Sequence, residues 1–424
     1  MKNFYRSKFF LNNVVDNNRP FIHRFYDTSP ISPSGKYIAL FELPYEDRTP
    51  SPGDTGFVVV IELTTRNIIY RSETAAWDTQ LGAQVQWGRK DDELYFNRLN
   101  GTSIYGVVVN LFKNKEESLP QPIYMISPNG KYAVSTCLKR ISNVQKGYGV
   151  VLNKSDTPTN LGASNLDGVI ITDLISKEWR MVLSYQDIYE KLIEKFHDLD
   201  MDKGGFYGFH TKWNPKFDRI MLVLRWLPVN SSKTKNYLIT FNSDGGDIKM
   251  LVDADRWVGG HHPNWCPDGE NIIMNLMFPN PKFNFGKAEL LFEKFFRKLK
   301  LRFHSNHKHL KLSIINDFDG TISTFNNNVF GSGHPVMCDG YVITDAYPNE
   351  RVALRNGDVP LRLIGPSSCE VIAFLHTKPK YSNKVEWRID PHPSIDRTGT
   401  KLVFNARSGD FRGVYIMDIE NVNV

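Results

Sequence analysis

A short polar turn followed by a run of apolar, β-branched or aromatic residues recurs along the whole chain. Seven copies begin at Ser32, Trp87, Ser127, Trp213, Trp265, Met337 and Ile395, and read SPSGKYIAL, WGRKDDELYF, SPNGKYAVS, WNPKFDRIML, WCPDGENIIMN, MCDGYVITD and IDRTGTKLVFN. A turn rich in Pro, Asp and Gly ahead of alternating apolar residues is typical of a β-hairpin. The pattern therefore predicts an all-β repeat protein.

The spacing of the copies favours a seven-bladed β-propeller formed by residues 1–424 as one domain. A four-stranded blade needs about 40–45 residues, and most intervals are longer, so most blades must carry long loops. The last repeat has room for three strands. We expect the segment at about 21–26 to add the fourth strand and close the ring, which removes exposed sheet edges. Six or eight blades stay open as alternatives because the copy at Trp87 is weak.

Two insertions have apolar residues at helical spacing, at about 184–199 and 286–303. The second, GKAELLFEKFFRKLKLRF, is strongly amphipathic and basic. It is predicted either to lie on an anionic membrane surface or to pack as a helix, on the flank of the propeller or in a self-association contact.

Composition narrows the partners only slightly. The formal net charge is +6, which suits an acidic glycan, a nucleic acid or an anionic membrane. No run of basic residues interleaved with aromatic residues dominates the chain, which argues against a nucleic-acid partner. The four cysteines form no CxxC pair and are too sparse for a disulfide framework. The sequence shows no signal peptide, and no run approaches the roughly 20 apolar residues of a membrane span. We therefore expect a cytoplasmic protein.

Four histidines keep step with the repeat. His210, His262, His334 and His392 each lie six to eight residues before the turn, near the start of the first strand of the hairpin. Gln84 occupies the matching place in the second repeat. The second strands end at Asn97, Arg225, Asn275, Asp345 and Asn405. Since paired strands run antiparallel, both sets should meet on one face of the propeller, around its central channel.

This set of side chains suits several kinds of chemistry. Neutral imidazoles with a carboxylate bind Zn or Mn. An imidazole can also act as a general base, and a guanidinium such as that of Arg225 binds carboxylates in a bidentate fork. Structural hydrogen bonding between blades is the alternative for the histidines.

The chain resembles the β-propeller polysaccharide lyases, namely oligogalacturonate lyase and the propeller-type ulvan lyases. The stretches that carry the resemblance are AAWDTQLGAQVQWG (75–88), HHPNWCPDG (261–269), GSGHPVMCDGYVITDAY (331–347), RIDPHPSIDRTGTKLVFN (388–405) and FRGVYIMDI near the end. These enzymes cleave uronate-containing glycans by β-elimination, with a metal beside the substrate.

The resemblance implies a role for each candidate residue. His334, His392 and Asp390 are expected to bind a divalent metal, Mn or Zn, with Ca as a further candidate. The expected catalytic groups are His262 as base, Arg225 on the uronate carboxylate, and His210 and Tyr148 as reserve acids or bases. The expected substrate contacts are Asn275, Asn405 and Gln84. The partner implied is an acidic oligosaccharide or polysaccharide.

The early repeats depart from this pattern. No histidine occurs between His23 and His197, and Gln84 and Asn97 cannot shuttle a proton. This argues against ulvan lyase chemistry. Two alternatives therefore stay open, a propeller that binds glycan or protein without catalysis and a different enzyme on the same scaffold.

Overall fold

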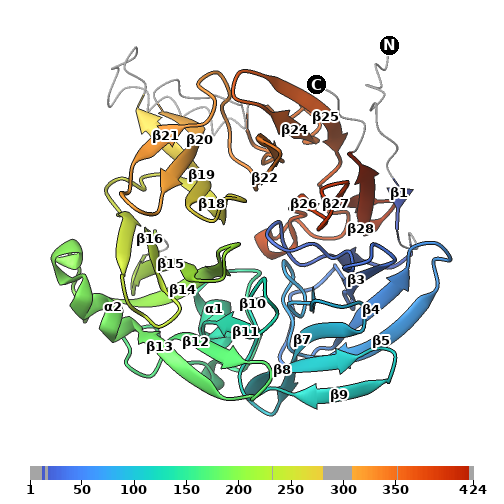
Figure 1. The fold of residues 1–424 in the computed structure, drawn as a ribbon, viewed down its shortest axis with the longest axis horizontal. Helices are drawn as coiled ribbons and strands as arrows, with labels where there is room; N and C mark the ends of the chain where they lie inside the picture. The colour runs from blue at the N-terminus through green and yellow to red at the C-terminus, as the bar shows by residue number, and fades with distance from the viewer. Residues whose placement is uncertain (1–11, 15–17, 232, 280–307, 351, 420–424) are drawn as a thin grey trace.

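The computed structural model describes residues 12–14, 18–231, 233–279, 308–350 and 352–419. In these residues the chain forms seven antiparallel four-stranded sheets arranged around a centre, which is a seven-bladed β-propeller (Figure 1). The predicted fold is confirmed.

The first four blades follow one another along the chain, with the innermost strand first in each. Blade 1 contains β2 (Phe21–Ile22), β3 (Tyr37–Glu42), β4 (Gly56–Glu62) and β5 (Ile68–Thr74). Blade 2 contains β6 (Gln86–Trp87), β7 (Glu93–Asn100), β8 (Ser103–Asn110) and β9 (Lys115–Ser118). Blade 3 contains β10 (Met125–Ile126), β11 (Tyr132–Ser135), β12 (Gly168–Asp173) and β13 (Trp179–Ser184). Blade 4 contains β14 (Gly204–Trp213), β15 (Arg219–Pro228), β16 (Lys235–Asn242) and β17 (Lys249–Val252).

The last three blades complete the ring. Blade 5 contains β18 (Gly260–Trp265), β19 (Asn271–Pro279), β20 (Lys308–Asn316) and β21 (Ile322–Thr324). Blade 6 contains β22 (Val336–Cys338), β23 (Tyr341–Thr344), β24 (Val359–Ile364) and β25 (Cys369–Leu375). Blade 7 contains β26 (Ser394–Ile395), β27 (Lys401–Ser408), β28 (Phe411–Asp418) and β1 (Asn12–Asn13).

The repeated turns explain why these segments form hairpins. Five of the seven turns use a glycine with a positive φ, a conformation that costs other residues free energy. These glycines are Gly35, Gly130, Gly269, Gly340 and Gly399, with φ between 67° and 78°.

The ring closes with an N-terminal strand, but not with the predicted segment. β1 pairs with β28, so that Asn12 lies opposite Ile416 and Asn13 opposite Tyr415. The segment at 21–26 instead begins blade 1, because Phe21 and Ile22 pair with β3. This strand consists of two asparagines and has no alternation of apolar and polar residues. Its pairing with β28 could therefore not be predicted from the sequence.

The helical segments lie in the connections between strands. The structure describes α1 (Leu138–Val144), α2 (Tyr185–Lys191) and the 3-10 helices Lys154–Asp156, Ile193–Phe196 and Val385–Trp387. α2 lies in the first predicted insertion, and Ser184 and Asp187 form a capping box at its start. The basic insertion at 286–303 lies outside the described residues. Among the described residues, no helix combines the length and apolar character needed to cross a membrane.

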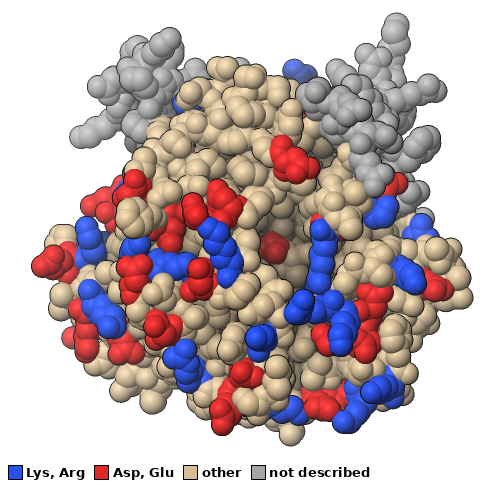
Figure 2. Space-filling model, in the orientation of Figure 1, with Lys and Arg blue, Asp and Glu red and all other residues tan. Residues whose placement is uncertain are grey.

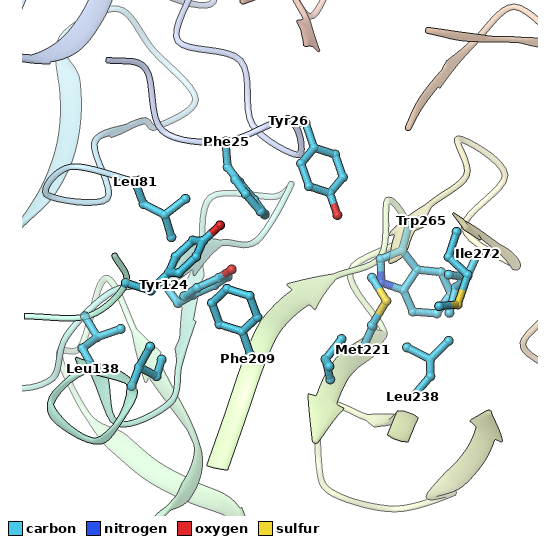
Figure 3. Packing of buried hydrophobic residues seen from close by; sticks show 14 of the residues in the cluster. Phe25, Tyr26, Leu81, Tyr124, Leu138, Phe209, Met221, Leu238, Trp265 and Ile272 are labelled. Carbon is cyan, nitrogen blue, oxygen red and sulfur yellow. The ribbon is translucent and has the colours of Figure 1, made fainter. Parts of the chain in front are cut away.

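An N-terminal segment fills the middle of the ring. After β2, Phe25 and Tyr26 enter a buried apolar cluster with Tyr124, Phe209 and other residues of several blades (Figure 3). Lys212 lies 4.1 Å from the centroid of the Tyr26 ring and forms a buried ion pair with Asp27, which also binds Arg24. Side chains of this segment therefore pack in the middle of the ring, against the histidine positions.

Candidate metal centre and adjoining pocket

Three of the four in-phase histidines, and Gln84 at the matching position of blade 2, share an unusual backbone conformation. Gln84, His210, His262 and His392 have φ values of 59°, 50°, 61° and 49°, in the left-handed region that non-glycine residues rarely adopt. The register of the blade shifts at His210 and at His262, which is the mark of a β-bulge. Strained backbone of this kind persists where the surrounding structure demands it, often at functional sites.

The four histidines come together at the centre, as the sequence predicted. The ring centroids of His262 and His334 are 3.9 Å apart, those of His334 and His392 4.4 Å, and those of His210 and His262 6.1 Å. All four side chains are buried, and Phe25 and Tyr26 pack against them. The imidazoles thus form one contiguous cluster.

His334, Asp390 and His392 have the arrangement of a metal site. One ligand atom from each lies within 4.8 Å of the other two, and all three residues are buried. Nε2 of His334 and both ring nitrogens of His392 have no hydrogen-bond partner, although an unpaired buried polar atom is costly. Burial lowers the pKa of His392 well below its usual value, so the imidazole is neutral, the form that binds metal. The residues present therefore fit a divalent cation.

Asp345 forms hydrogen bonds with both histidines of this cluster. Its carboxylate lies 2.9 Å from Nδ1 of His334 and also accepts the backbone N–H groups of His334 and His392. A carboxylate on the outer nitrogen of a ligating histidine fixes the ring orientation and raises its basicity. Asp345 was expected on this face of the propeller, but no role for it was predicted.

Arg388 connects the cluster to Tyr148. Its Nε donates to Asp390 at 2.7 Å, and its Nη2 donates to the hydroxyl of Tyr148 at 2.8 Å. Since the Tyr148 hydroxyl accepts this bond, its own proton is free to be donated elsewhere. Burial raises the pKa of Tyr148 to about 12, so that proton is held at neutral pH.

His262 is oriented by two contacts. Its Nδ1 lies 3.0 Å from the carbonyl oxygen of Gly333, which can only accept, so this nitrogen carries the proton. Its Nε2 is then the acceptor for the hydroxyl of Tyr347 at 3.2 Å. Burial, and then the neighbouring His334, lower the pKa of His262 well below its usual value.

Arg225 lies beside the cluster without an anionic partner. Its guanidinium donates to Gln145 at 2.8 Å and stacks on Phe209 at 4.8 Å, and among the described residues no carboxylate pairs with it. Its charge contributes to the lowered pKa of His210, after burial and the charge of Lys212. A half-buried cation next to buried imidazoles is a ready site for an anionic group.

The three predicted substrate contacts form hydrogen bonds within the protein. Asn275 donates to the carbonyl of Gly333, and Asn405 donates to the carbonyl of Asp390 and accepts the N–H of His23. Gln84 accepts from Arg24. All three side chains are buried and join neighbouring blades or the central segment, and their contact with a substrate stays a prediction.

A pocket of about 410 Å³ adjoins the cluster. It is lined in part by Tyr347, Arg355, Thr377, Lys378, Arg388 and Asp390. Asp390 belongs both to the metal cluster and to the pocket wall, so a ligand in the pocket lies next to the cluster. The face of the molecule in Figure 2 is hollowed near its centre and carries mixed cationic and anionic side chains around the hollow.

Comparisons with known proteins agree with the fold. No family model matches the chain, and no curated protein sequence matches it. Among solved structures, an oligogalacturonate lyase from Vibrio parahaemolyticus is 10% identical, with 98% of this chain and 95% of that chain covered and a TM-score of 0.62. An oligogalacturonate lyase in complex with manganese has the same identity and coverage and a TM-score of 0.63.

A propeller in a different class of enzyme also matches. The tricorn protease is 10% identical, with 96% of this chain but 34% of that chain covered and a TM-score of 0.52. At such low identity these likenesses show the fold alone. The chain therefore shares the β-propeller fold of the oligogalacturonate lyases.

Sequence reasoning missed Arg388, Tyr347 and the supporting role of Asp345. Arg388 lies two residues before Asp390, and Tyr347 lies two residues after Asp345. In extended chain, alternate residues point to the same side. That spacing was the available signal for both side chains.

Proposed function

We propose that this protein is a metal-assisted lyase that cleaves a uronate-containing oligosaccharide by β-elimination. The observation that carries the proposal is the buried His334–Asp390–His392 cluster, in which three of the four imidazole nitrogens lack a hydrogen-bond partner, beside a pocket that contains Arg388. The likeness in fold to an oligogalacturonate lyase in complex with manganese points in the same direction.

The donor set indicates which metal would bind. His334 would bind through Nε2, because Nδ1 faces Asp345, and His392 and Asp390 would complete the set. Two imidazoles with one carboxylate suit Mn or Zn, whereas Ca prefers about six to eight oxygen ligands. When bound, such a metal supplies a Lewis acid that neutralises the uronate carboxylate and makes the C5 proton more acidic.

The two arginines of the site have different roles. Arg225 has no carboxylate partner among the described residues, so it can bind the C6 carboxylate of the uronate unit. Arg388 is held by Asp390 and Tyr148, so it fixes the positions of these two groups.

Two proton transfers complete the elimination. Nε2 of His262 accepts the C5 proton through the Tyr347 hydroxyl, the C5–H electron pair forms the C4=C5 double bond, and the C4–O4 bond breaks. The Tyr148 hydroxyl donates its proton to the departing O4. The ring of His210 stacks on that of Phe25, with 5.2 Å between the ring centroids, and the residue is 2% exposed. We therefore propose that His210 packs against the histidine cluster and takes no part in proton transfer.

The test is product formation from a panel of uronate-containing oligosaccharides, followed by the ultraviolet absorbance of the unsaturated uronate. We expect product with the metal-loaded protein and a loss of at least about 100-fold in rate for His262→Ala, the usual share of a general base. The matched control is His197→Ala, an exposed histidine outside the site, which should retain full activity.

The non-catalytic alternative makes the opposite prediction. A propeller that only binds glycan would bind an acidic oligosaccharide equally well after His262→Ala and would release no unsaturated product. Binding without product from every uronate substrate would contradict the proposed lyase.

A further inference from the structure

Three tryptophans occupy the same position of the repeat, and one of them lacks the hydrogen bond that the other two form. The indole N–H of Trp87 donates to the carbonyl oxygen of Pro30 at 2.7 Å, and that of Trp265 donates to the carbonyl oxygen of Lys212 at 3.3 Å. Each bond joins the blade of the tryptophan to the preceding blade. Trp213, at the matching position of blade 4, is 2% exposed, and among the described residues its indole nitrogen has no hydrogen-bond partner.

The unpaired indole of Trp213 lies at a pocket between blades 3 and 4. This pocket has a volume of about 330 Å³, and Trp213 forms part of its wall. A buried donor almost always has an acceptor, because an unpaired one costs free energy. For Trp87 and Trp265 the preceding blade supplies the acceptor, whereas for Trp213 an oxygen of a ligand in the pocket would supply it.

This pocket lies on the face of the propeller opposite to the histidine cluster. The histidines lie toward the beginning of the first strands, and paired strands run antiparallel, so first and third strands end on the other face, where second and fourth strands begin. Trp213 ends β14 and Asp173 ends β12, while Tyr132 begins β11 and Trp179 begins β13. All four residues line the pocket, which is therefore separate from the candidate metal centre.

The aromatic walls of this pocket suit the C–H groups of a sugar ring. The side chain of Trp179 is 49% exposed, which leaves an indole surface open to a ligand. The ring of Tyr132 stacks on that of Trp213, with 6.2 Å between the ring centroids. Small-molecule sites combine such aromatic walls with a few polar groups, and their usual volumes include that of this pocket.

The polar groups of the pocket favour a neutral sugar over an acidic one. Asp173 and Glu178 supply carboxylate oxygens, which accept hydrogen bonds from sugar hydroxyls but repel a uronate. Arg180 is the one cation of the wall, and it donates to the carbonyl oxygen of Ser243 at 2.9 Å. This bond joins blade 3 to blade 4, so it holds the two sides of the pocket together.

We propose that the pocket between blades 3 and 4 binds a neutral sugar unit, which packs on Trp179 and accepts the indole N–H of Trp213 through one of its oxygens. The inference is independent of the proposed lyase chemistry. It gives the protein a second glycan-binding face, where a glycan is held through a neutral unit without occupying the metal centre.

The test follows the indole N–H signals of isotope-labelled tryptophans by NMR while methyl β-glucoside, methyl β-galactoside or methyl α-mannoside is added. The signal of Trp213 is the one that disappears in Trp213→Phe. We expect at least one glycoside to move this signal downfield as the hydrogen bond forms, while the signals of Trp87 and Trp265 stay in place. Glucuronate should bind about two- to five-fold more weakly than the neutral glycoside, because the carboxylates of the pocket repel it.

Two variants separate the contributions of the two tryptophans. Trp179→Ala should weaken binding of the glycoside about five-fold, and the matched control is Phe318→Ala, an aromatic residue that is 85% exposed on the same face. Trp213→Phe, followed through the signal of Trp179, should weaken binding about two- to ten-fold. It should also lower the midpoint of denaturant unfolding less than Trp265→Phe does, because it breaks no hydrogen bond within the protein.

A Trp213 signal that moves with none of the three glycosides would overturn the sugar site, as would binding that Trp179→Ala leaves unchanged. A signal that moves with a proline-rich peptide and with no glycoside would assign the pocket to a protein partner, and it would equally contradict the proposal.

Discussion

At the scale of single residues, the candidate metal cluster depends on side chains that orient other side chains. Asp345 holds His334 through Nδ1 and binds the backbone of both histidines, while Arg388 holds Asp390. Nε2 of His334 and both ring nitrogens of His392 remain without a hydrogen-bond partner. Under the proposed function, these contacts hold His334 and Asp390 in place before a metal binds, which favours tight binding.

Asp345→Asn should weaken metal binding by about 10- to 100-fold, because the amide keeps the size of the side chain but loses its negative charge. Titration of Mn²⁺ and Zn²⁺ into metal-free protein measures the change. Asp202→Asn, at an exposed loop position, is the matched control. Unchanged affinity in Asp345→Asn would show that Asp345 has no role in metal binding.

At the scale of secondary-structure elements, the sequence predicts the elements that recur in the repeats and few of the elements that occur only once. The seven turns and the regular position of the four histidines could be recognised because similar local sequences recur from blade to blade. The closing strand at Asn12–Asn13 has no apolar pattern, and its pairing with β28 depends on the position of blade 7. For the same reason, Phe25 and Tyr26 could not be placed at the centre from sequence.

The strand ends show a further limit of sequence reasoning. Asn97, Asn275 and Asn405 occupy matching positions, and each hydrogen-bonds to backbone of the next blade around the ring. Asp345, at the same position of blade 6, reaches both His334 and His392 instead. The sequence places all of these residues on one face, but only the three-dimensional contacts distinguish Asp345, which contacts two histidines, from the asparagines.

At the scale of the whole molecule, buried neutral histidines make the closed ring sensitive to acid. His23 is fully buried between blade 1 and blade 7, where its Nε2 lies 3.4 Å from the carbonyl oxygen of Pro391. Burial lowers the pKa of His23 from 6.5 to about 4. The unfolded chain therefore takes up a proton below about pH 6.5 that the folded protein does not.

The free energy of unfolding should accordingly fall as the pH is lowered from about 6.5 to about 4, with roughly 3 kcal/mol attributable to His23. His210, His262 and His392, whose pKa values are also lowered by burial, act in the same direction. His23→Gln, which retains a donor for Pro391, should reduce this pH dependence by about one proton. Denaturant unfolding at several pH values measures it, and an unchanged slope in the variant would contradict the assignment.

The most direct test of the central claim is the metal content of the purified protein after exposure to Mn²⁺ or Zn²⁺, measured by elemental analysis. We expect about one metal ion per chain in the wild type and in the surface control His376→Ala, and a loss of bound metal in His334→Ala and in His392→Ala. A wild type that binds no metal, or variants that bind as much as the wild type, would contradict the account.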